Sequence, residues 1–235
     1  RCVLMHFGFF IFFISLEKLS LSTVTALFFA APFFITILSA LVLSERIGLI
    51  RILILVLGFI GVFLIVKPFK ESEFSFFMLA PLFTAFSYAV AMVISKYTKE
   101  NENAFLQAFQ QYSVSLLLSV ITYIIILVLP LYYINTEEWR FIFGSIKFDD
   151  YNILISIAIL SIFGTLGMTS LIHAYQVGSP ITNGPTEYVL LILAIINGYF
   201  FFGNIPDYLS LAGIILIILG GWALFFREHQ LNKIQ

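Results

Sequence analysis

Charged side chains are scarce in this sequence. It contains 12 basic and 13 acidic residues among 235, or 11%, whereas charged residues make up about one quarter of an average soluble domain. With a mean hydropathy of +1.05, an ordinary water-soluble fold could not cover itself with polar side chains. The apolar fraction of 61% excludes a soluble enzyme and a disordered chain, and the net charge of −1 excludes a basic nucleic-acid binder. The composition therefore predicts an integral membrane protein.

Cysteine is nearly absent as well, since Cys2 is the only one. A single thiol excludes a disulfide framework and any metal site built from cysteines. The sequence also lacks a His-Glu-x-x-His pattern, paired intramembrane aspartates and a glycine-rich phosphate loop. We therefore expect no enzymatic activity, no metal and no cofactor.

The sequence does contain eight long apolar runs. A hydrocarbon core about 30 Å thick needs about 20 apolar residues per helix, and continuous runs favour helices over the alternating strands of a barrel. The runs cover residues 3–15, 21–43, 48–66, 74–95, 104–130, 152–175, 181–203 and 208–226. They predict an all-α membrane protein with eight visible transmembrane helices. The aromatic-rich connector 131–151 is expected to lie at the membrane surface.

The few charges locate the ends of these helices. All of them fall outside the apolar runs except Arg51, in the first turn of its helix, and Glu187. Eight spans place both ends of this chain on one side, and a cytoplasmic C-terminus puts most of the Lys and Arg residues inside. We expect a multi-pass protein of the inner (cytoplasmic) membrane with its C-terminus in the cytoplasm.

An internal repeat relates two parts of the chain at a displacement of 159 residues. It aligns Thr23 with Thr182 and Gly61 with Gly220, and the ends of the apolar runs agree. Because an odd number of spans separates the copies, equivalent helices cross the membrane in opposite directions, as in the inverted repeats of secondary transporters. The second copy has five helices and the first shows three. We therefore expect a ten-helix, five-plus-five fold whose first two helices precede Arg1.

Each half also carries residues typical of one transporter family. In both halves a proline within an apolar run is followed by a polar helix end and then by a helix with glycines. The residues are Pro32, Glu45, Gly58 and Gly61 in the first half and Pro185, Tyr188, Gly203, Pro206, Gly213, Gly220 and Gly221 in the second. These motifs resemble EamA-type transporters of the drug/metabolite transporter superfamily, and Lys96 matches the basic residue that commonly ends the sixth helix of that pattern.

The resemblance implies a domain division, a function and partners. Residues 1–68 would be a truncated first EamA repeat of three helices, 69–73 a connector, 74–228 the second repeat of five helices and 229–235 a cytoplasmic tail. The family implies alternating-access transport of a small polar metabolite, such as an amino acid or a related compound. The implied partners are that small-molecule substrate and the lipid bilayer, with a homodimer left open and no nucleic acid. A non-transporting assembly subunit and an intramembrane enzyme are the alternatives.

Glu187 is the charge that helix ends do not explain, because it lies about two turns inside the seventh run. A carboxylate in the hydrocarbon region costs about 2.5–3.5 kcal/mol, so this side chain should face protein or water. Pro185 removes a backbone donor and favours a local break beside it. Glu187 is predicted to bind an ammonium group or to take up a coupling proton. The alternative is that Glu187 lies near a helix end, where nearby donors or water molecules hydrogen-bond its carboxylate.

Other polar residues form two weaker patterns. Ser161, Thr165, Thr169 and His173 recur every four residues, which predicts a stripe that faces a wet cavity or another helix. Amides at the start of the fifth run could bind a substrate or lie at the headgroup level. The substrate- or proton-binding candidates are Glu187, Tyr188, His173, Thr169, Thr165, Gln107 and Gln111, with Tyr88 and Asn197 weaker. The structural motif residues are Pro32, Glu45, Gly61, Pro185, Gly203, Pro206 and Gly220, of which the glycines of the last helix in each repeat are assigned to packing.

Overall fold

The computed structural model describes residues 1–19, 21–44, 47–66, 76–128, 151–202 and 207–232, and within them every regular element is a helix. An apolar segment in lipid can satisfy its backbone only internally, which is why such runs fold as helices. In chain order the helices are α1 (Cys2–Lys18), α2 (Leu21–Phe28), α3 (Ala31–Val42), α4 (Leu49–Val66), the 3₁₀ turn η2 (Phe76–Met78), α5 (Leu79–Tyr97), α6 (Ala104–Val128), α8 (Tyr151–Val177), α9 (Pro180–Thr186), α10 (Val189–Phe202) and α11 (Tyr208–Asn232).

The predicted apolar runs are all helical where the structure describes them, but two of them are broken. Run 21–43 is not one helix, because α2 ends at Phe28 and α3 begins at Ala31. Pro32 causes this difference: it lies in the first turn of α3, where its missing N–H is harmless, and it cannot continue α2. Run 181–203 is broken as well, which confirms the break expected beside Pro185.

Several predicted features lie outside the described residues. They are Glu45, Gly203, Pro206, the connector 69–73 and the connector 131–151 except for Tyr151. The tail predicted for 229–235 begins as a continuation of α11, which extends through Asn232.

Four helical stretches of the described chain are long and apolar enough to cross a membrane. They are Thr23–Val42, Phe76–Tyr97, Ala104–Ile125 and Ile153–Val177, and the shorter apolar helices are Leu49–Ile65 and Tyr208–Ala223. The part of the chain that the structure describes is therefore all-helical, and its spans make the protein a multi-pass membrane protein.

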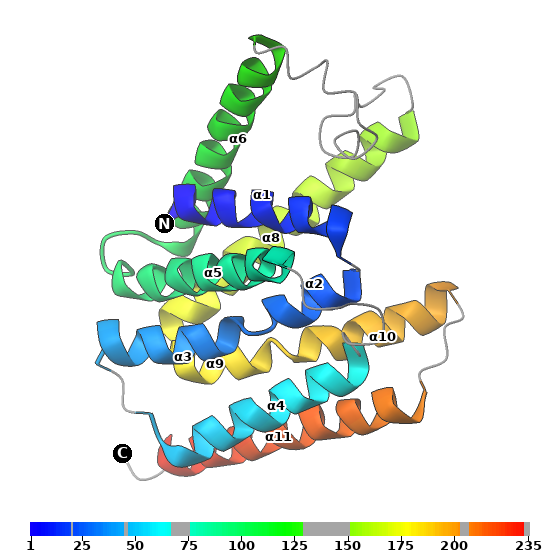
Figure 1. The fold of residues 1–235 in the computed structure, drawn as a ribbon. Helices are drawn as coiled ribbons and strands as arrows, with labels where there is room; N and C mark the ends of the chain where they lie inside the picture. Colours follow the sequence, from blue (N-terminus) through cyan, green and yellow to red (C-terminus); the bar gives the residue numbers. More distant parts are fainter. Residues whose placement is uncertain (20, 45–46, 67–75, 129–150, 203–206, 233–235) are drawn as a thin grey trace.

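Helix α5 occupies the middle of the packed bundle (Figure 1). It packs against α1 and α3 and also contacts α8, while α3 packs against α9 and α4 packs against α11. The buried cluster at this position includes Met5, Ile35, Tyr88, Met92 and Tyr175. Figure 1 also shows that the start of α1 and the end of α11 lie at the same end of the bundle, with α6 and α8 extending beyond α1. Side chains from distant parts of the sequence thus meet around α5.

The contact between α4 and α11 depends on two facing glycines. A Cβ atom added to Gly61 would lie 2.8 Å from the carbonyl oxygen of Gly213, and one added to Gly213 would lie 2.6 Å from that of Gly61. Small residues permit such close approach of helices in lipid, which supports the packing role predicted for Gly61 and Gly213. Gly220 would make only ordinary contact with Ile54, and a Cβ at Gly221 would meet nothing within 4 Å.

Replacement of Gly61 by alanine should separate α4 from α11, because the obstructing atom is backbone and cannot rotate away. We expect Gly61→Ala to destabilise the protein by about 1–3 kcal/mol, the usual range for overpacking. Thermal unfolding of the purified protein in detergent measures the effect. The matched control is Gly221→Ala on α11, where the added methyl meets no atom, and equal stability of the two variants would contradict this account.

Candidate functional site

The carboxylate of Glu187 lies where three helices meet. Glu187 directly follows α9, at the break before α10. The hydroxyl of Tyr88, on α5, donates to its Oε1 atom at 2.8 Å, and the hydroxyl of Tyr175, on α8, donates to the same atom at 2.5 Å. One carboxylate oxygen thus joins α5, α8 and the α9–α10 break.

The two tyrosines bring polar atoms into an apolar region. Tyr88 is 6% exposed and Tyr175 is fully buried, both within the apolar cluster around α5. A phenol suits this position because its ring packs as an apolar body while its hydroxyl supplies one donor. Among the described residues no basic side chain pairs with Glu187, and its Oε2 atom accepts no hydrogen bond. The carboxylate is therefore held by neutral donors and keeps one open acceptor atom.

The backbone turns sharply at this position. The N–H of Glu187 donates to the carbonyl of Gly184 at 3.1 Å, and the N–H of Tyr188 donates to that of Pro185 at 3.3 Å. These bonds span three residues instead of four, as in a tightened 3₁₀ turn. Pro185 also leaves the carbonyl of Ile181 without its usual helical donor. The break therefore places polar backbone close to the carboxylate, an arrangement typical of substrate sites in transporters.

The other helix break faces the same place. The ring of Phe28, at the end of α2, lies 5.6 Å from that of Tyr88, and the ring of the next residue, Phe29, lies 5.9 Å from that of Tyr188. Helix α3 packs on α9, where a Cβ at Gly184 would contact Pro32 at 3.5 Å. The breaks in the two helices are therefore adjacent, with an aromatic layer between them.

Tyr188 does not join the hydrogen bonds of Glu187. It is 1% exposed and packs in a second apolar cluster with Phe29, Val62, Leu191 and Ile217. A Cβ at Gly58 would overlap its ring, so α4 approaches it closely. Its hydroxyl is buried and has no hydrogen-bond partner among the described residues. Tyr188 is next to Glu187 in the chain, but its ring packs against α4 and α11.

The polar stripe on α8 is not brought to Glu187. The hydroxyls of Ser161, Thr165 and Thr169 each donate to the carbonyl four residues earlier in the same helix, at 2.7, 2.7 and 2.8 Å. Thr165 and His173 are exposed, and Thr169 is half-buried. Among the described residues, these side chains have no hydrogen-bond partner on another helix, and their role in a cavity stays a prediction.

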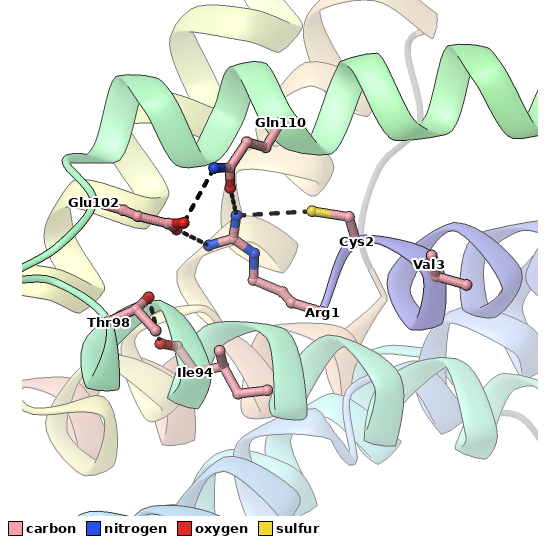
Figure 2. A pocket seen from close by; sticks show the side chains of 7 residues that line it. All are labelled: Arg1, Cys2, Val3, Ile94, Thr98, Glu102 and Gln110. Atoms are coloured by element: carbon pink, nitrogen blue, oxygen red, sulfur yellow. Dashed lines mark hydrogen bonds and ion pairs between the residues drawn. The ribbon is translucent and has the colours of Figure 1, made fainter.

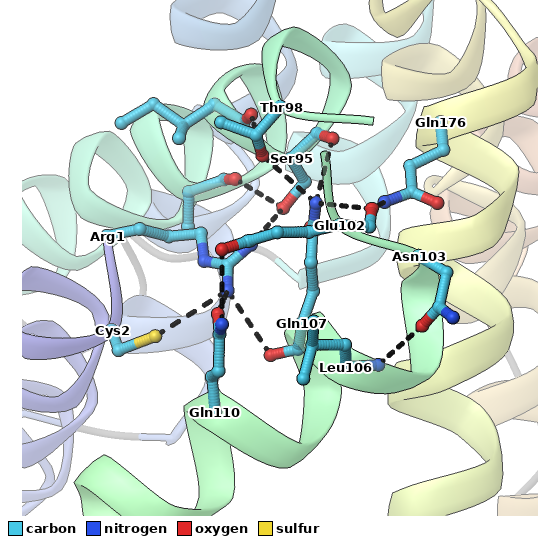
Figure 3. Close-up of polar contacts among 12 residues, drawn as sticks. Arg1, Cys2, Ser95, Thr98, Glu102, Asn103, Leu106, Gln107, Gln110 and Gln176 are labelled. Carbon is cyan, nitrogen blue, oxygen red and sulfur yellow. Dashed lines mark hydrogen bonds and ion pairs between the residues drawn. The ribbon is translucent and has the colours of Figure 1, made fainter. Parts of the chain in front are cut away.

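Of the predicted amides, Gln107 belongs to a separate polar cluster at the turn between α5 and α6 (Figure 3). Gln107 is fully buried, and its Nε2 atom donates to the carbonyls of Ser95 and Glu102 and to the Thr98 hydroxyl, at 3.0–3.3 Å. Gln111 donates to the carbonyl of Cys2 at 3.3 Å. Gln107 thus ties the turn together, whereas Gln111 links α6 to the start of α1, and neither amide converges with Glu187.

The same cluster borders a cavity of about 380 Å³ at the start of α1 (Figure 2). The guanidinium of Arg1 donates to Gln110 at 2.9 Å and lies 3.8 Å from the carboxylate of Glu102. The lining residues are Arg1, Cys2, Val3, Ile94, Thr98, Glu102 and Gln110. Within the described parts of the chain, no group of three His, Cys, Asp or Glu residues could hold a metal ion here or elsewhere.

The sequence does not identify Tyr175 as a residue of this candidate site, and it indicates Tyr88 only weakly. Both are tyrosines in otherwise apolar helices, and a lone intramembrane carboxylate needs donors of this kind. The need of this carboxylate for hydrogen-bond donors was the indication that the sequence offered for a tyrosine partner. It could not select these two among the 11 tyrosines, because nothing in the sequence indicates which helix faces which.

Comparison with known proteins gives a consistent result. The model of the EamA-like transporter family matches residues 2–67 and 75–226. The chain is 25% identical over 213 residues to a pseudopaline exporter, CntI, of Pseudomonas aeruginosa, covering 91% of this chain and 69% of that protein. It is 28% identical over 233 residues to an S-adenosylmethionine uptake transporter of Rickettsia conorii, covering 98% and 71%.

A solved crystal structure supports the fold. It superposes with a TM-score of 0.77 at 15% sequence identity and covers 97% of this chain and 77% of the other. The match to the family model confirms the resemblance to EamA-type transporters, and the family and the named relatives are transporters and not enzymes.

The hydrogen bond between Tyr175 and Glu187 should be measurable as an energetic coupling. In a double-mutant cycle of Tyr175→Phe and Glu187→Leu, we expect a coupling of about 1 kcal/mol, because each single change removes the same interaction. Equilibrium unfolding in mixed micelles provides the four free energies.

The control cycle pairs Glu187→Leu with Tyr123→Phe, since Tyr123 is 63% exposed on α6. This cycle should show no coupling. Additive effects in the Tyr175 cycle would mean that the two side chains do not interact.

Proposed function

We propose that this chain, which belongs to the EamA-like transporter family, moves a small polar metabolite across a bacterial inner membrane by alternating access, with Glu187 in the transport path. One observation carries the proposal. A carboxylate with two neutral donors and an open oxygen lies at a helix break inside the bundle. Intramembrane carboxylates are costly and mark substrate or ion pathways.

Glu187 binds the cationic group of the substrate, or a proton, through its open Oε2 atom. The tyrosine hydroxyls donate to Oε1, so they orient the carboxylate without neutralising it. The aromatic rings of Phe28 and Tyr88 add a wall beside the site, and such faces attract organic cations. Thr165, Thr169, His173, Gln107 and Gln111 are secondary candidates that would contribute only in other conformations.

The proposed fold has two inverted repeats of five helices each, of which residues 1–68 and 74–228 belong to the first and second. The helix bounds support this division. A displacement of 159 residues carries the start of α2, at Leu21, onto the start of α9, at Pro180, and the start of α4, at Leu49, onto that of α11, at Tyr208. Both broken helices are equivalent under the same displacement. The eight visible helices would then be part of a ten-helix carrier.

The substrate proposed is an amino acid or a related compound with a cationic centre. S-adenosylmethionine, named in the Rickettsia relatives, has both an α-amino group and a sulfonium. Either positive centre could pair with a carboxylate whose other partners are neutral. The remaining partners proposed are the lipid bilayer and a second copy of the chain.

The C-terminus is proposed to lie in the cytoplasm. Both ends of the described chain lie at one end of the bundle (Figure 1), and this orientation places most of the Lys and Arg residues inside. A C-terminal green fluorescent protein fusion should therefore fluoresce in cells, whereas an alkaline phosphatase fusion at the same position should be inactive. The opposite pair of results would invert the orientation.

Removal of the Glu187 charge should abolish transport. We expect Glu187→Gln in the full-length protein to lower uptake at least tenfold, because a hydrogen bond to a charged group contributes about 1.5–3 kcal/mol. Proteoliposome counterflow with radiolabelled S-adenosylmethionine and a panel of amino acids measures it, over a range of pH. Glu100→Gln is the control, since Glu100 is exposed in the turn after α5. Wild-type uptake by Glu187→Gln with an unchanged pH dependence would exclude the proposed role.

A further inference from the structure

Helix α8 ends in carbonyl groups that the helix cannot satisfy. The carbonyl of Gln176 would bond the N–H four residues later, but that residue is Pro180, which has none. The N–H of Thr182, which could reach Gly178, donates to the carbonyl of Ser179 instead, at 3.0 Å. The end of α8 therefore needs donors from another element, as helix C-termini do.

Lys96 supplies those donors from the end of α5. Its ammonium donates to the carbonyls of Gln176 at 2.8 Å, Val177 at 3.2 Å and Gly178 at 2.7 Å. An ammonium carries three donors and no acceptor, so it matches three consecutive carbonyls, and its charge complements the negative end of the helix dipole.

This contact is the second of two polar links between α5 and α8 among the described residues, where the two helices also pack through apolar side chains. The first is at Glu187, which accepts from Tyr88 of α5 and Tyr175 of α8. Tyr88 and Lys96 are eight residues apart on α5, or about 12 Å along its axis. On α8 the two points are adjacent, since Tyr175 directly precedes Gln176. A movement of the last turn of α8 would therefore disturb both points together.

The same turn is held further by neighbouring side chains. The Nε2 atom of Gln176 donates to the carbonyl of Glu102 at 2.9 Å, in the turn between α5 and α6 (Figure 3). The amide of Asn183, on α9, donates to the carbonyl of Ala174 at 2.6 Å. The end of α8 is thus fixed to α5, to the α5–α6 turn and to α9.

We propose that Lys96 is a positioning residue that holds the last turn of α8 against the end of α5, keeping this end of the bundle closed and Tyr175 on Glu187. This proposal rests on the proposed function, because closure matters only if a substrate path passes Glu187. In that path, release of the turn from Lys96 opens this end and removes one of the two donors from the carboxylate. The closed end and the occupied Oε1 atom therefore belong to the same conformation.

The test measures the separation of α5 and α8 directly. Spin labels are attached at Tyr97→Cys and Val177→Cys in a Cys2→Ser background of the full-length protein in nanodiscs. Both labelled residues are well exposed, at 67% and 72%, and flank the Lys96 contact. Electron paramagnetic resonance then reports the distance distribution between the labels.

We expect Lys96→Met to increase the ratio of separated to closed molecules at least about tenfold, because it removes three hydrogen bonds from a charged group and the loss of even one has about that effect. Lys96→Arg should restore the closed distribution, because a guanidinium also donates to several carbonyls. Lys99→Met is the matched control, three residues further on and exposed, and it should leave the distribution unchanged. A residue that merely stabilised the fold would lower the yield of folded protein without changing the distances in it.

An unchanged distribution in folded Lys96→Met would overturn the proposal, as would a shift of equal size in Lys99→Met. The measurement needs no substrate, so its failure is distinct from that of the proposed function. If Lys96→Met separates the helices while Glu187→Gln still transports, the positioning role stands and the transport role of Glu187 falls. If the distances stay fixed and Glu187→Gln is inactive, the reverse holds.

Discussion

A carboxylate inside an apolar helix bundle has to receive hydrogen bonds, and the arrangement around Glu187 follows from that need. Tyr88 and Tyr175 reach it from different helices, which brings α5, α8 and the α9–α10 break to one atom. The tyrosine rings then form part of the apolar cluster that packs α1, α3 and α5 together. The polar site and the main packing contacts are therefore built from the same side chains.

Prolines determine where two of the apolar runs break into separate helices. Pro32 and Pro185 each end or interrupt an apolar run that hydropathy alone would make one helix. Both breaks lie against aromatic rings, with Phe28 next to Tyr88 and Phe29 near Tyr188. A membrane tolerates irregular backbone only where protein or water covers it. The two breaks cover each other, and this is the reason that they lie together at the centre of the bundle.

The features that could be predicted from the sequence are those that depend on residues close together in the chain. Continuous apolar runs indicated helices, a lone acid indicated a site, and Pro185 indicated the break beside it. The sequence could not predict contacts between helices, because periodicity defines a face and not its neighbour. Gln107 shows the limit: its amide suits a substrate cavity, yet it is buried in the α5–α6 turn. The stripe with Thr165 likewise bonds its own helix, a local solution that the spacing of four residues also permits.

The choice of partners for Glu187 bears on how a carrier of this family can change conformation. An intramembrane carboxylate paired with a lysine would be electrically neutral and would gain little from a further cation. Glu187 instead has two neutral hydroxyls, and both donate to one oxygen. No basic side chain among the described residues compensates a charge on Glu187, so under the proposed function a proton or a cationic substrate would gain a large share of its binding energy there. Tyr175 belongs to the turn of α8 that Lys96 contacts, so a ligand that displaced its hydroxyl from Glu187 would also act on this turn. Under the proposed roles, binding at Glu187 and closure by Lys96 would be coupled through one short segment.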